Sequence, residues 1–165
     1  MNKEEQVLTA FRDLFNKRSW LNKTKMESSL KGHKPSEVHC IEYIGTLTDA
    51  NVTRLAESLY MTRGAISKIT QKLLRKGLIE SYRKPENQKE IYFRLTEEGR
   101  DIWRIHDELH REFRDRDRPV FEHVTDDQYD GMLSFMEKYS RHLDEELKKQ
   151  GLTRKAGVEA EAEDV

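Results

Sequence analysis

The sequence contains one cysteine and no long apolar run, and each of these excludes a class of protein. Cys40 alone forms no internal disulfide, which indicates a reducing compartment and a fold stabilised by packing, by a partner subunit or by a bound ion. No apolar stretch approaches the roughly 20 residues that span a bilayer, and the first residues mix acids and bases without a signal-peptide pattern. We therefore expect a cytoplasmic protein with no membrane segment.

The length of 165 residues suits one domain with its own core and is short for two. Charged residues make up 37% of the chain and hydrophobic residues 35%, so a core forms only if helices present their apolar side chains as narrow stripes. The expected class is mainly α. From Gly151 the chain becomes small and acidic, and we expect residues 151–165 to be a disordered tail.

Apolar spacings of three and four predict helices, and alternating residues predict strands. The expected helices cover residues 4–25, 36–47, 52–59, 62–76, 96–118 and 125–147, and the expected strands cover residues 78–83 and 90–95. Ser36, Thr62, Thr96 and Thr125 are candidate N-caps, and Gly77 is placed to close the fourth helix in the left-handed conformation. The order is four helices, a β-hairpin and two helices.

The net charge of −1 hides an uneven distribution along the chain. Between Thr62 and Arg94 nine Lys or Arg residues stand against three acids, a local balance of +6, which leaves −7 for the remainder. A basic segment inside an acidic protein is typical of a phosphate-binding surface, although a solvated charged face would look the same.

Residues 52–69 form a helix, a tight turn and a second helix, and a basic hairpin follows at once. This order predicts a winged helix-turn-helix, whose second helix lies in the major groove of DNA while the wing reaches the adjacent minor groove. The expected DNA contacts are Thr62, Arg63, Gly64, Ser67, Lys68, Gln71 and Lys72 on the helix, and Arg83, Lys84 and Lys89 on the wing.

Together with the Leu95-Thr96-Glu97-Glu98-Gly99 run, this segment resembles the MarR family over about residues 5–150. The resemblance implies one winged-helix domain over residues 1–150, with a DNA-binding part at about 36–97 and a dimerisation part at about 1–31 and 118–150. It also implies a homodimer that represses by binding pseudo-palindromic operators. The chain departs from the family at the wing, where Asn87 and Lys89 replace the usual Asp and Arg.

Independently, the first and last helices carry apolar stripes that a single small winged-helix core leaves without a partner, so a dimer would bury them.

His106 and His110 are four residues apart on one helix, a spacing that suits a shared transition metal. Here the chain is similar to the zinc-sensing AdcR/ZitR branch of MarR regulators. This resemblance implies a zinc site made of Glu27, His39, His106 and His110. Cys40 and Glu37 are alternatives to Glu27. The second metal site of that branch has no matching ligands here, because Lys34, Val38 and Ile105 stand in those places.

Three alternatives remain open. A small aromatic or anionic ligand could bind between the dimerisation and DNA-reading parts near Trp20, Tyr43 and Trp103, although these aromatics also suit ordinary packing. A redox switch at Cys40 lacks an activating basic cluster. An enzyme is disfavoured, because the histidine pair has no Glu directly after its first histidine and the chain has no nucleophile elbow or phosphate-binding glycine loop.

Overall fold

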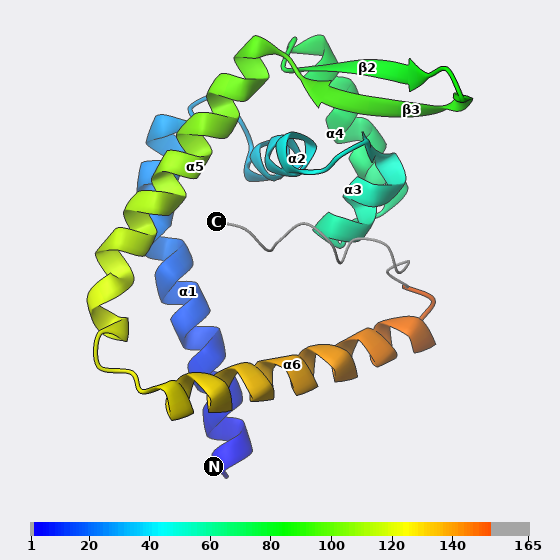
Figure 1. Cartoon of the computed structure of the whole chain (residues 1–165). Helices are drawn as coiled ribbons and strands as arrows, with labels where there is room; N and C mark the ends of the chain where they lie inside the picture. Colours follow the sequence, from blue (N-terminus) through cyan, green and yellow to red (C-terminus); the bar gives the residue numbers. More distant parts are fainter. Residues whose placement is uncertain (1, 153–165) are drawn as a thin grey trace.

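The computed structural model describes residues 2–152, so the predicted acidic tail lies outside the described residues except for its first two. The chain folds into a winged part that carries a small sheet, and three long helices extend beyond it (Figure 1). The elements are α1 (Lys3–Ser29), α2 (Pro35–Thr46), β1 (Ala50–Asn51), α3 (Val52–Leu59), α4 (Arg63–Arg75), β2 (Ile79–Lys84), β3 (Asn87–Leu95), α5 (Glu97–Asp117), the short 3-10 helix η1 (Arg118–Phe121) and α6 (Asp126–Lys149).

The main core lies inside the winged part, where α2, α3, α4 and the sheet meet. Ile41, Leu55, Ile66 and Leu73 are fully buried, one or more from each of the three helices. Burying a side chain of this size stabilises a fold by roughly 1.5–3 kcal/mol. The core therefore fixes the positions of α3 and α4 relative to α2.

The sheet has three antiparallel strands in the order β1, β3, β2. The hairpin was predicted, but β3 begins earlier than expected, at Asn87. The sequence analysis expected no strand between the helices at 36–47 and 52–59, but Ala50 and Asn51 pair with Phe93 and Tyr92 as the strand β1. A strand of two residues is too short to show any alternation in the sequence.

Local capping explains most of the helix boundaries. Thr62, Thr96 and Thr125 each accept a hydrogen bond from a backbone N–H in the first turn of the next helix, as predicted. Gly77 closes the α4 end with a φ of +69°, which is also as predicted.

Ser36 is not an N-cap, because α2 begins at Pro35, with Lys34 as its capping residue. The physical reason is that proline fixes φ in the helical range and loses nothing at the first helical position, where its missing N–H would have no partner. The Glu37 carboxylate completes the start by accepting the backbone N–H of Lys34 at 2.7 Å.

The helices α1 and α5 extend from the winged part in the same direction, and α6 lies across their far end (Figure 1). The helix α1 runs beside α5, and a second small core of Leu30, Val38, Leu109 and Phe113 joins them to α2. The helix α6 crosses the N-terminal half of α1, where Phe11 and Phe135 stack with ring centroids 6.1 Å apart.

Neither α1 nor α6 contains a buried residue in the single chain. The apolar face predicted for α6 points inward only in part, since Leu133 is 62% exposed and Phe135 44%. Within residues 2–152, no helix combines the length and the apolar character that crossing a bilayer requires.

The close approach of α5 to the start of β2 predicts the effect of one substitution. A Cβ on Gly99 would lie 1.9 Å from the backbone oxygen of Leu78. Ala usually stabilises a helix relative to Gly by about 1 kcal/mol, but Gly99→Ala is expected to lower the unfolding free energy by about 1–3 kcal/mol, because the backbone must shift. Urea unfolding followed by circular dichroism measures the change.

Gly64→Ala is the matched control, because a Cβ at this helical glycine meets nothing within 4 Å. Its unfolding free energy should stay the same or rise. Equal stabilities for the two alanine variants would contradict the close approach at Gly99.

Candidate nucleic-acid interface and histidine cluster

The helix α4 is fixed by its apolar side and presents a polar side to solvent. Ile66 and Leu73 are fully buried, and the Thr70 hydroxyl donates to the Ile66 carbonyl at 3.0 Å. Arg63, Gly64, Lys68 and Gln71 are exposed, while Ser67 and Lys72 are half-buried. The predicted DNA-contacting residues of this helix thus share one side, with Lys72 nearest the protein.

The cations on this surface differ in whether a carboxylate already holds them. Among the described residues, Arg63, Lys68 and Lys89 form no ion pair with any side chain. Lys72 instead lies 3.3 Å from the Glu37 carboxylate, and Lys84 pairs with Asp49. The cations left for an external phosphate are therefore on the exposed side of α4 and near the tip of the wing.

The wing is braced by one carboxylate that sequence reasoning missed. Asp49 lies in the left-handed region with a φ of +57° and accepts a hydrogen bond from the Tyr82 hydroxyl at 3.0 Å. The pKa of Asp49 is lowered, and the largest cause is the hydrogen bond that Lys84 donates to its carboxylate. Lys84 also lies over the Tyr92 ring, 5.0 Å from its centroid. No local pattern indicates these contacts, because 33 residues separate Asp49 from Tyr82.

The other predicted wing residues lie along the same hairpin. Arg83 donates to the backbone carbonyl of Gln88 across the hairpin, which holds its guanidinium along the ribbon. Asn87 accepts from the backbone N–H groups of Lys89 and Glu90 and shapes the turn. Lys89 is exposed.

Three of the four predicted metal ligands gather between α2 and α5. His106 is 3% exposed, and its Nε2 lies 3.0 Å from the Nε2 of His110. The His39 ring centroid is 6.1 Å from that of His106, and Glu42 brings an Oε2 to 3.9 Å from His106 Nε2. We call His39, Glu42, His106 and His110 the histidine cluster.

Burial favours the neutral form of two histidines of the cluster, His106 and His110. It lowers the pKa of His106 to about 4, with smaller contributions from His110 and His39. Burial also lowers the pKa of His110, assisted by Arg114 and Arg18. A neutral imidazole carries a free nitrogen lone pair, so at neutral pH the two rings share one hydrogen bond or a common ligand.

The fourth predicted ligand, Glu27, is not brought to the cluster. Its carboxylate is exposed on α1 and lies 3.8 Å from the ammonium of Lys23. The alternatives are also engaged elsewhere: Glu37 contacts lysines, and Cys40 is fully buried in the main core. Glu42, three residues after His39, is the carboxylate that does approach, and its helical spacing from His39 is the signal that could have found it.

The donor set of the cluster fits a transition metal in type, and only partly in position. Two nitrogen ligands of a tetrahedral zinc ion lie about 3.3 Å apart, given zinc to nitrogen distances of about 2.0–2.1 Å, close to the 3.0 Å between His106 and His110. As they stand, no three His, Cys, Asp or Glu side chains within residues 2–152 are arranged to hold an ion.

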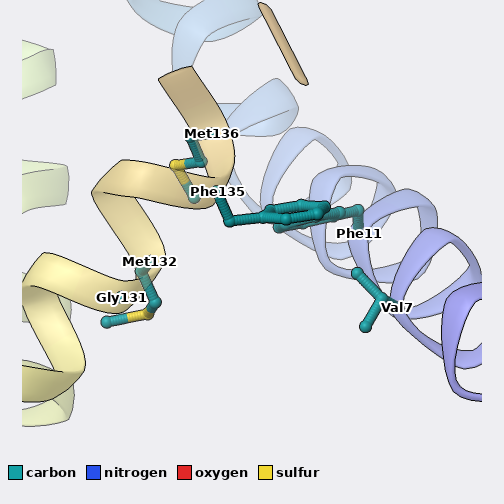
Figure 2. A pocket seen from close by; sticks show the side chains of 6 residues that line it. All are labelled: Val7, Phe11, Gly131, Met132, Phe135 and Met136. Carbon is teal, nitrogen blue, oxygen red and sulfur yellow. The ribbon is translucent and has the colours of Figure 1, made fainter. Parts of the chain in front are cut away.

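The remaining alternatives meet different surroundings. Tyr43 and Trp103 pack against the main core, which supports ordinary packing, whereas Trp20 is 82% exposed on α1. Burial raises the pKa of the Cys40 thiol to about 12, so almost none of it is thiolate at neutral pH and it is unsuited to a redox switch. Figure 2 shows an apolar hollow between α1 and α6, lined by Val7, Phe11, Gly131, Met132, Phe135 and Met136.

Comparison with known proteins identifies relatives of this chain. Residues 34–91 match the model of the MarR family. The HTH-type transcriptional regulator PchR of Bacillus subtilis (strain 168) is 28% identical over 111 residues, which are 67% of this chain and 66% of that protein. The uncharacterized HTH-type transcriptional regulator YhjH of the same strain is 31% identical over 108 residues, covering 66% of this chain and 59% of YhjH. The chain thus spans about two thirds or less of the length of these two relatives.

Solved structures confirm the predicted fold class, a mainly α winged helix-turn-helix with long terminal helices. Streptococcus pneumoniae FabT in complex with DNA superposes with a TM-score of 0.73 at 21% identity, covering 87% of this chain and 99% of FabT. AdcR from Streptococcus pyogenes superposes with a TM-score of 0.60 at 17% identity, covering 82% of this chain and 98% of AdcR. At such identities the likeness concerns the fold alone, so the finer resemblance to the zinc-sensing branch has no specific support.

Proposed function

We propose that this chain, a MarR-family protein by the match of its residues 34–91, is a sequence-specific DNA-binding transcriptional repressor. The observation that carries the proposal is the polar side of α4, where Arg63 and Lys68 are exposed without an ion pair among the described residues. The family match and the names of the relatives agree with the prediction that the chain is a regulator and not an enzyme.

The geometry supports the docking expected from sequence. The exposed side of α4 would lie in the major groove, where Arg and Lys reach guanine edges and phosphates and the half-buried Ser67 permits close approach. The hairpin of β2 and β3 extends beside α4 (Figure 1), so Lys89 could enter the neighbouring minor groove. The proposed function agrees with the cytoplasmic location expected from the sequence.

The unburied helices support the homodimer. Helices of this length are held in folded proteins mainly by packing of an apolar face, yet α1 and α6 bury no residue in the single chain. A second copy of the chain would cover both faces and the hollow of Figure 2. Twofold symmetry would then present two α4 helices to a pseudo-palindromic operator.

The dimer predicts the effect of a charge on α6. Leu133→Asp is expected to convert the protein to a monomer, because Leu133 is 62% exposed in the single chain and would bring an unpaired carboxylate into the interface. Sedimentation velocity measures the oligomeric state. Lys138→Asp, on the exposed surface of the same helix, is the control and should leave the state of the wild type unchanged. A monomeric wild type would contradict the dimer.

The DNA surface predicts two charge deletions. Arg63→Ala and Lys68→Ala are each expected to weaken binding to a duplex from the gene's own upstream region. Each lost phosphate contact should reduce the slope of log K against log salt by about 0.9. Fluorescence anisotropy over a salt series measures both quantities. Arg104→Ala is the control, because Arg104 is paired with Asp101 on α5 and should not affect the slope. Unchanged affinity in both test variants would remove α4 from the interface.

A metal ion such as zinc is the effector that the histidine cluster favours. His39, His106 and His110 would supply neutral imidazole nitrogens, and Glu42 is nearer than the Glu27 expected from sequence. The ion would join α5 to α2 and so limit how far the dimerisation helices turn relative to the DNA-reading part.

The metal proposal predicts that protein purified without a histidine tag contains zinc and that a chelator changes its affinity for the upstream duplex. His106→Gln and His110→Gln should each lose the metal, because each removes one of the two adjacent nitrogens. His123→Gln, outside the cluster, is the control. Metal-free protein with chelator-independent binding would favour the alternative effector, a small aromatic or anionic ligand near Trp20.

A further inference from the structure

Glu37 is a buried carboxylate outside both the histidine cluster and the exposed DNA surface. It is 2% exposed, at the start of α2. One oxygen, Oε2, accepts the backbone N–H of Lys34 at 2.7 Å. The other, Oε1, faces two ammonium groups, that of Lys72 on α4 at 3.3 Å and that of Lys76, the residue that caps the end of α4, at 2.9 Å. One side chain therefore connects the first turn of α2 with the C-terminal half of the helix proposed to read DNA.

The same cluster extends into the loop between α1 and α2. The Lys76 ammonium also donates to the backbone carbonyl of Gly32 at 3.0 Å. Gly32 has a φ of +87°, a conformation that favours glycine, so this carbonyl is held by the backbone in one direction. Lys76 thus ties α4 both to the carboxylate and to the loop.

The surroundings keep Glu37 ionised. Burial alone raises its pKa, but the Lys34 backbone N–H and the ammonium groups of Lys76 and Lys72 outweigh burial and lower the pKa overall. The Lys34 backbone N–H donates a hydrogen bond to Oε2, whereas Oε1 is compensated by the two ammonium groups as ion pairs and has no hydrogen-bond partner among the described residues. If the carboxylate were neutral, the two lysines would face each other without compensation.

Stability alone is a weak reason for such a cluster. Taking a carboxylate out of water costs several kcal/mol, and apolar side chains of similar volume often replace a buried ion pair without loss. What a buried charge set does supply is a defined geometry, since few arrangements satisfy all of its donors at once.

We propose that Glu37 is a positioning residue for DNA recognition, which fixes α4 against α2 and the α1–α2 loop and withholds Lys72 from the phosphates. The Lys72 ammonium points to a carboxylate inside the protein, so its charge adds little to sequence-independent attraction. Binding then depends on Arg63, Lys68 and the wing, and the ratio of operator to random-DNA affinity rises. This inference rests on the proposed DNA-binding function.

The test compares binding to the upstream duplex and to a random duplex of equal length over a salt series, by anisotropy. Lys72→Met should leave both salt slopes unchanged, because the lysine makes no phosphate contact. Glu37→Gln should release Lys72, steepen the slope on random DNA by about 0.9 per chain, and lower the operator-to-random ratio several-fold. Glu112→Gln is the matched control, since it frees Lys25 on α1 from an exposed pair remote from α4.

The outcomes separate the possibilities. A slope reduced by about 0.9 in Lys72→Met means a direct phosphate contact and overturns the inference, even if Glu37→Gln fails to fold. If Glu37→Gln folds with less stability but keeps the wild-type slope and ratio, the carboxylate is merely structural and the inference is also overturned. A wild-type chain that binds neither duplex at low salt overturns the proposed function itself.

Discussion

The packing of α4 onto the main core is the constraint on which the rest of the structure depends. Ile66 and Leu73 are fully buried, so the helix has one rotational setting in which its apolar residues are out of water. That setting directs Arg63 and Lys68 to solvent and brings Lys72 and Lys76 to Glu37. The same burial that stabilises the winged part thus decides which cations face outward.

Sequence reasoning identified what local chemistry controls. The caps at Thr62, Thr96 and Thr125 and the left-handed Gly77 depend on neighbours within a few residues, and all four were predicted. The order of helices and strands followed from apolar spacing. The start of α2 was misplaced because Ser36 is a common N-cap and the helix begins instead at proline.

Contacts between distant segments were beyond that reasoning. The pairing of β1 with β3, the Asp49 brace and the Glu37 cluster each join residues more than thirty positions apart. The histidine pair was found because its spacing of four residues is a local pattern. The carboxylate beside it was misassigned, because Glu42 approaches His106 from a different helix. Formal charge along the chain indicated a basic segment correctly, but it did not distinguish cations held by carboxylates from those left for a ligand.

The contact of Gly99 with Leu78 packs the start of the long helix α5 directly against the start of the wing. The helix begins against the backbone that starts β2, with no room for a side chain between them. A helix of 21 residues is about 30 Å long. It therefore acts as a lever: a tilt of about 5° displaces its far end by about 2.6 Å, which is comparable to a hydrogen-bond length. A small shift imposed at the distal end of α5 would therefore reach the start of the hairpin through the backbone contact of Gly99 with Leu78.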